Sequence, residues 1–91
     1  MKKQNQVKSD VVTQKMSDGR VRVVSPHRYS LVVDAANLLK QSWIVKFGNS
    51  ELIYLRGEKN LTRAVEIAQS LAARVRSPEV QNFRAILSEV L

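Results

Sequence analysis

Residues 43–55, WIVKFGNSELIYL, are the stretch that decides the fold, because they read as a β-hairpin. Two runs of aromatic and β-branched residues flank Gly48 and Asn49, which tolerate the backbone angles of a two-residue turn. Such a turn sets the register of the two strands. The expected pairs are Lys46 with Glu51, Val45 with Leu52 and Trp43 with Tyr54.

This register assigns each side chain of the hairpin to a face. One face carries Trp43, Val45, Phe47, Leu52 and Tyr54, and the other carries Ile44, Ile53 and Leu55. Both faces are largely apolar, so we expect the base of the hairpin to be covered on both sides. Trp43 and Tyr54 are accordingly interpreted as core and boundary residues rather than as a platform for stacked bases.

Two helices are predicted after this hairpin. Asn60 can cap a helix, and apolar residues recur at helical spacing from Leu61 to Val75, which predicts a helix over 61–76. Ser77 and Pro78 then favour the start of a last helix. The apolar positions of that helix are Val80, Phe83, Ile86, Leu87 and Val90.

A second hairpin is predicted upstream, over residues 11–24. Asp18 and Gly19 form a turn signal between two β-prone runs. On the second strand, Val21 and Val23 share one face, and Arg20, Arg22 and Val24 share the other.

The segment between the hairpins has two interpretations. Ser25 as N-cap and Pro26 as the first helical residue favour a helix over about 26–41, supported by apolar spacing from Tyr29 onward. The alternative is a strand over 29–33 with a helix that begins at Asp34. We prefer the longer helix. The predicted fold is α+β, a small antiparallel sheet from two hairpins with one helix between them and two C-terminal helices.

Length and composition fit one domain. The chain has 91 residues, of which 44% are hydrophobic, enough for a single core. Residues 1–9 are polar and basic and are predicted to be a mobile tail, leaving 10–91 as the domain. The absence of cysteine excludes disulfides, and no apolar run is long enough to cross a membrane. We therefore expect a cytoplasmic protein without a membrane partner.

The positive charge is concentrated at the N-terminal end. Residues 1–28 hold seven Lys and Arg against two acids, whereas 29–91 hold eight against six, for a formal net charge of +7. This asymmetry is typical of a protein that binds a polyanion. The candidate nucleic-acid-binding residues are Lys2, Lys3, Lys8, Lys15, Arg20, Arg22 and Arg28. Arg63, Arg74 and Arg76 flank the predicted helix and extend the set.

Nothing in the sequence predicts catalysis. The single histidine, His27, falls in a predicted helix start with no partner to orient it as a base. The eight acids are scattered, so no metal site is expected. The glycines have turn positions and do not form a phosphate loop. We expect a protein that is not an enzyme and uses no cofactor.

The favoured function is therefore nucleic-acid binding, with DNA slightly ahead of RNA, by a small regulatory or accessory factor. An arginine-bearing hairpin would lie along the phosphate backbone, and the tail would add a non-specific attraction. A ribosome-associated protein is a weaker variant of this hypothesis.

The alternative function is that of an adaptor. It would bind an acidic protein, or a second copy of the chain, through the C-terminal helix. The residues of that candidate interface are Phe83, Leu87, Val90 and Leu91. We prefer a role for Phe83 in closing the core of the monomer.

Overall fold

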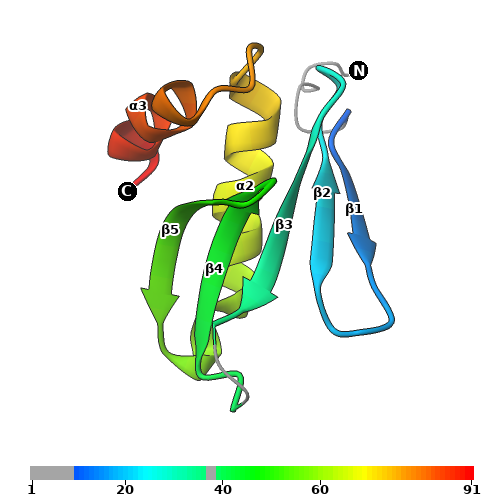
Figure 1. Cartoon of the computed structure of the whole chain (residues 1–91), viewed down its shortest axis with the longest axis vertical. Coiled ribbons are helices and arrows are strands. Elements are labelled where there is room, and N and C mark those ends of the chain that lie inside the picture. The colour runs from blue at the N-terminus through cyan, green and yellow to red at the C-terminus, as the bar shows by residue number, and fades with distance from the viewer. Residues whose placement is uncertain (1–9, 37–38) are drawn as a thin grey trace, which may run out of the picture.

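Five antiparallel strands form one sheet, and two helices follow them in the sequence (Figure 1). The computed structural model describes residues 10–36 and 39–91. The strands lie in the sheet in chain order. They are β1 (Val12–Lys15), β2 (Val21–Val24), β3 (Ser30–Ala35), β4 (Ser42–Phe47) and β5 (Ser50–Arg56). A short 3₁₀ turn, η1 (Glu58–Asn60), leads into α2 (Leu61–Arg74), and α3 (Val80–Val90) ends the domain.

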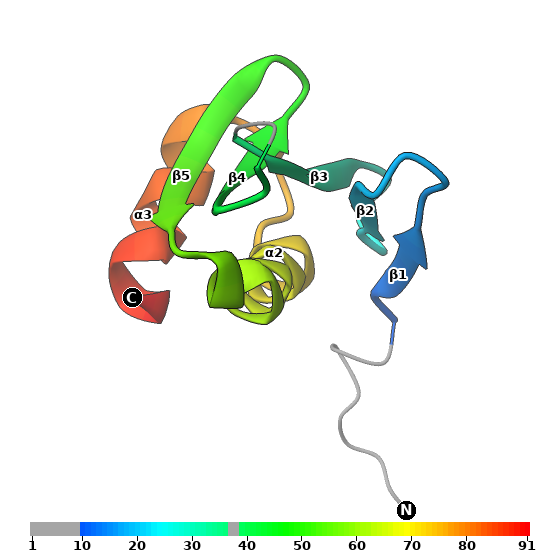
Figure 2. The same ribbon diagram turned by 90° about the horizontal axis from the view of Figure 1, so that it is seen from below.

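The two faces of this sheet differ. Helix α2 packs across β2, β3 and β4, and α3 lies beside α2 and the β5 edge (Figure 2). Ala64, Ala68 and Ala72 of α2 are buried, and their small side chains let the helix approach the sheet closely. We call the face under α2 the covered face and the opposite one, which carries neither helix, the open face. The covered face holds the core residues Val21, Val23, Leu31, Val33 and Val45.

The predicted first hairpin is confirmed. β1 pairs antiparallel with β2, Val12 opposite Val24 and Lys15 opposite Val21. Gly19 adopts a φ of 93° in the turn between them, a value that suits glycine. Val21 and Val23 are buried and Arg22 is exposed, as the alternation predicts. The two C-terminal helices are confirmed as well, although α2 ends at Arg74 rather than at residue 76 and α3 begins at Val80, after Ser77 and Pro78.

The helix predicted over 26–41 is wrong. β3 takes its place, pairing with both β2 and β4, so a strand joins the two hairpins and both helices follow the sheet. The alternative, a strand over 29–33, agrees better with the structure. The helix that this alternative places from Asp34 onward is wrong, because β3 continues to Ala35. Leu31 and Val33 are fully buried against α2, which outweighs the weak helical spacing of the segment.

The hydrogen bonds of Ser25 explain why Ser25 and Pro26 wrongly predicted the start of a helix. Its hydroxyl accepts a hydrogen bond from the backbone N–H of His27 (2.9 Å), the local bond that an N-cap would also make. The same hydroxyl donates to the carbonyl of Ala72 at the end of α2 (2.6 Å). Serine and proline therefore form the turn between β2 and β3.

Three side chains of this turn satisfy the C-terminal end of α2. The last carbonyls of a helix lack partners within it. Besides the bond from Ser25, the Tyr29 hydroxyl donates to the carbonyl of Val75 (2.6 Å), and Nε2 of His27 lies 3.1 Å from that of Ala73. The turn thus fixes α2 over the sheet.

Helix α3 closes the core at the same end. Phe83 is fully buried, and its ring contacts those of Tyr29 and Phe47, with centroids 5.5 and 5.2 Å away. Leu87 is buried one turn further along. The apolar side of α3 is therefore used within the domain.

Candidate nucleic-acid interface

A β-bulge in β5 decides which side chains face outward. The predicted pair Lys46 with Glu51 is present, but past it Val45 lies opposite Ile53. Leu52 is thus an extra residue on β5, and the register shifts by one. The predicted pairs of Val45 with Leu52 and Trp43 with Tyr54 are wrong.

The shift exchanges the faces of the strand beyond the bulge. Ile53 and Leu55 oppose Val45 and Trp43, so they lie on the covered face. Tyr54 lies opposite Ile44, on the open face, where its side chain is 50% exposed. The predicted grouping of Tyr54 with Trp43 is therefore overturned. The bulge lets three apolar residues, including the buried Leu52, pack inward while a tyrosine turns to solvent.

Basic side chains share the open face with Tyr54. Arg56 is two residues further along β5, so it projects on the same side, and it is exposed. A cross-strand row runs from Gln14 through Arg22, Val32 and Lys46 to Glu51, one residue from each strand. Arg22 in this row is exposed and Lys46 is half-buried. The open face therefore combines one exposed aromatic residue with three cations, Arg22, Lys46 and Arg56, and with the carboxylates of Asp34 and Glu51.

The negative charge of Asp34, the carboxylate at the centre of this face, is partly compensated by neighbouring groups. Asp34 lies opposite Ile44, with its Oδ2 3.9 Å from Nζ of Lys46. Its Oδ1 accepts a hydrogen bond from the backbone N–H of Ala35 (2.8 Å). Asp34 also contributes to raising the pKa of Arg20, although the hydrogen-bonded Asp18 contributes more. The negative charge of Asp34 is thus balanced from two sides.

The binding residues predicted from the sequence do not form one patch. Arg22 lies on the open face, and Arg20 is in the β1–β2 turn, where its Nη2 is 2.7 Å from Asp18 Oδ2. That hydrogen-bonded pairing lowers the pKa of Asp18. Lys15 ends β1 on the opposite side, beside a cavity of about 230 Å³ that Leu61 and Val65 also line.

Arg28 is at the other end of the sheet, exposed in the β2–β3 turn with a φ of 70°. The structure thus brings Arg20 and Arg22 together near Asp34 and separates them from Lys15 and Arg28. Lys2, Lys3 and Lys8 lie outside the described residues, as does the predicted tail 1–9 as a whole.

The residues of the alternative interface divide between core and surface. Phe83 and Leu87 are buried, Val90 is half-buried against the core, and Leu91 is 66% exposed. The burial of Phe83 agrees with its preferred role in closing the core. Only the end of this set is accessible on the described chain.

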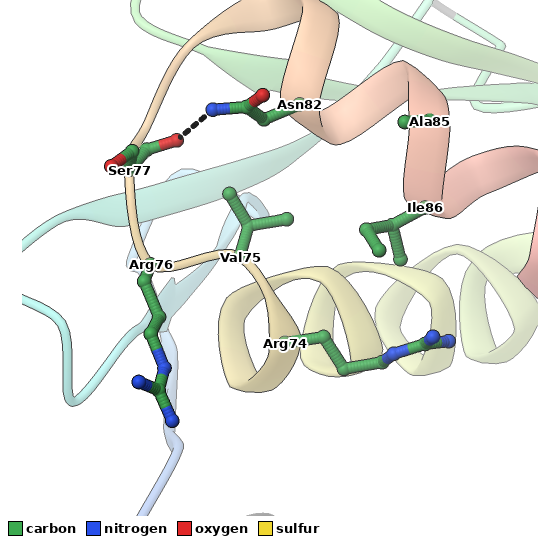
Figure 3. Close-up of a pocket in the computed structure, with 7 residues that line it drawn as sticks. All are labelled: Arg74, Val75, Arg76, Ser77, Asn82, Ala85 and Ile86. Atoms are coloured by element: carbon green, nitrogen blue, oxygen red, sulfur yellow. Dashed lines mark hydrogen bonds between the residues drawn. The ribbon is translucent and has the colours of Figure 1, made fainter.

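The corner between α2 and α3 contains a cavity of about 240 Å³ (Figure 3). Arg74 and Arg76 line it, but their side chains point in different directions rather than toward a common centre. Arg74 forms an ion pair with Glu89, and Asn82 donates a hydrogen bond to the carbonyl of Ser77 (2.8 Å). The polar groups of this corner are thus largely engaged with one another.

Among the side chains that the structure describes, no group of three or more from His, Cys, Asp or Glu is placed to hold a metal ion. His27 is half-buried with its ring against the end of α2. In residues 10–36 and 39–91 no helix has the length and apolar character that a membrane crossing requires.

Comparison with known proteins gives no relative for this fold and surface. Scans of protein-family models, of curated proteins and of solved structures found no match.

Sequence reasoning missed Tyr54, Lys46 and Arg56 as candidate binding residues. A signal for them was present in the alternation over residues 53–56, where Ile and Leu occupy one face and Tyr and Arg the other. The two-residue turn fixed the register at Lys46 and Glu51, and continuing that register without a bulge placed Tyr54 on the wrong face.

Proposed function

We propose that this protein is a non-enzymatic nucleic-acid-binding protein, a small regulatory or accessory factor that binds through the open face of its sheet. The observation that carries the proposal is the half-exposed residue Tyr54 on the same face of the sheet as Arg22, Lys46 and Arg56. Aromatic rings and basic side chains on one surface match the bases and phosphates of a nucleic acid. The formal net charge of +7 favours the same partner.

The N-terminal segment adds positive charge to the protein. Lys2, Lys3 and Lys8 supply attraction for phosphates that does not depend on sequence. We keep DNA slightly ahead of RNA as the ligand and the cytoplasm as the compartment, which a chain without cysteine fits. The adaptor hypothesis has less support, because Phe83 and Leu87 are already used in the core.

The test is binding of a fluorescently labelled oligonucleotide, measured by anisotropy over a range of salt concentrations. We expect binding at low salt that weakens steeply as salt rises. The Arg22→Gln variant removes one charge from the open face, and it should lower the slope of log K against log salt by about 0.7–0.9. The matched control is Arg84→Gln, which removes the same charge from an exposed position of α3.

The two variants have the same net charge, so any difference between them reports position. A drop in slope for Arg22→Gln alone supports the open face as the binding surface. Equal effects of both variants would show that binding follows total charge, and no binding at low salt would overturn the proposed function.

A further inference from the structure

The shape of the open face distinguishes between forms of nucleic acid. Reading duplex DNA requires an element that enters a groove, such as a helix or a β-ribbon. Both long helices of this domain lie away from the open face (Figure 2), and the β1–β2 hairpin is not a free ribbon, because β2 also pairs with β3. The face instead offers the pleated surface of five strands with an accessible aromatic ring. A sheet face with an exposed aromatic residue fits unpaired bases, which stack on aromatic side chains.

The environment of Tyr54 favours stacking over burial. Ile44, its cross-strand neighbour, is only 8% exposed and supports the ring from β4. Tyr54 itself is 50% exposed, so part of its surface is available to a ligand. Tyr54 can therefore meet a base at the surface, outside the buried core.

Cations lie where the phosphates of a stacked strand would pass. Arg56 follows Tyr54 on the same face, at a distance along the strand of about 6.8 Å between Cα atoms. Arg22 lies on β2, three strands away, which is about 14 Å across the sheet. Neither arginine forms an ion pair in the part of the chain that the structure describes, whereas Lys46 contacts Asp34.

We propose that the open face binds single-stranded nucleic acid, with an unpaired base stacked on Tyr54 and the backbone held by Arg56 and Arg22. This inference rests on the proposed function and specifies its ligand. The backbone crosses the sheet from β5 toward β2, so the bound segment spans several nucleotides, within the range of about 4–16 known for other sheet-based binders.

The test compares the affinity of the protein for two labelled oligonucleotides of about 16 nucleotides, each as a single strand and as a duplex, at one low salt concentration. Oligothymidylate and oligouridylate serve as single strands, and each is also measured after annealing to its complement. We expect either single strand to bind about tenfold or more tightly than its duplex. The difference between the two single strands decides between DNA and RNA.

Variants of Tyr54 test the stacking directly. Loss of base stacking on alanine substitution costs about 1–3 kcal/mol, so Tyr54→Ala should weaken single-strand binding about 5-fold to 150-fold. Tyr54→Phe keeps the ring and should retain wild-type affinity within about twofold. Trp43, the single tryptophan, is buried on the covered face, and its unchanged fluorescence will show that each variant is folded.

The outcomes separate this inference from the proposed function. Equal binding of single strand and duplex, with Tyr54→Ala unaffected and Arg22→Gln weakened, would overturn the inference and leave the proposed function standing. Loss of affinity in Tyr54→Phe as well as in Tyr54→Ala would show that the hydroxyl, rather than stacking, is what binds. Absence of binding to every oligonucleotide would overturn both.

Discussion

The two faces of one sheet carry different chemistry on adjacent residues. On β3, Val33 is fully buried beneath α2, whereas Val32 and Asp34, its direct neighbours, lie half-exposed on the open face. On β2, buried Val23 stands beside exposed Arg22. The covered face is apolar and holds the domain together by removing surface from water. The open face bears charges and a ring that the fold does not require.

This contrast separates stability from function. Residues of the covered face are constrained by packing, so substitutions there reduce the free energy of unfolding. The exposed residues of the open face, Arg22, Tyr54 and Arg56, are free to meet a ligand, so substitutions there should change binding and leave the fold intact. The bulge at Leu52 assigns Tyr54 to the second group and Ile53 to the first.

The largest effect is expected from Phe83→Ala. Phe83 is fully buried among Tyr29 and Phe47, and truncating such a ring costs about 3–5 kcal/mol in the free energy of unfolding. Tyr54→Ala should cost less than about 1 kcal/mol, because half of that side chain is already in water. Urea denaturation followed by Trp43 fluorescence measures both values.

Similar losses in the free energy of unfolding for Phe83→Ala and Tyr54→Ala would contradict the distinction between the two faces, because they would mean that Tyr54 is also a core residue. Sedimentation of wild type and Phe83→Ala adds a second test. We expect the variant to keep the molecular mass of the wild type, and a wild-type dimer that Phe83→Ala converts to monomer would favour the adaptor hypothesis.

A smaller effect is expected from the turn that holds α2. Tyr29→Phe removes the hydrogen bond to the carbonyl of Val75 and should cost about 1 kcal/mol. Burial raises the pKa of Tyr29, so the folded state favours the neutral phenol. The neutral Tyr29 phenol therefore contributes to the free energy of unfolding in full below the ordinary tyrosine pKa of about 10. This stabilisation is lost as pH rises through the raised pKa of Tyr29 in the folded state.

The wild type should therefore lose stability at alkaline pH more steeply than Tyr29→Phe. Denaturation curves between neutral pH and the alkaline range give the comparison. Parallel pH profiles for the two proteins would show that Tyr29 is not the group responsible.

The smallest effect on stability is expected from deleting residues 1–9. We predicted from the sequence that they do not contribute to the core, so the Tm should be unchanged. The deletion removes Lys2, Lys3 and Lys8, and it should lower the salt slope of single-strand binding by up to about 2. A clear fall in Tm on deletion would show that this segment belongs to the domain.

The sequence predicted the elements that local signals control. Asp18 with Gly19 and Gly48 with Asn49 specified both tight turns, and the apolar stripe from Leu61 specified α2. These features depend on residues close together in the chain. The predicted class, α+β, is confirmed for this reason.

Long-range contacts controlled what was missed. Ser25 has the same local bond in a turn as in a helix cap, and only the end of α2, 47 residues away, makes it a turn. The bulge at Leu52 is likewise set by what packs beneath β5, and the exposure of Tyr54 follows from it. For the candidate site, Arg22 was identified, whereas Tyr54 was assigned to the opposite face.

The most direct test of the open face as the ligand surface is an NMR titration of methyl groups with a single-stranded oligonucleotide. Val32 and Val33 are neighbours on β3, and Ile44 and Val45 are neighbours on β4, one of each pair on each face. We predict that the methyl signals of Val32 and Ile44 shift on titration and that those of Val33 and Val45 change much less. Shifts of equal size within each pair, or shifts confined to α2 and α3, would contradict the account.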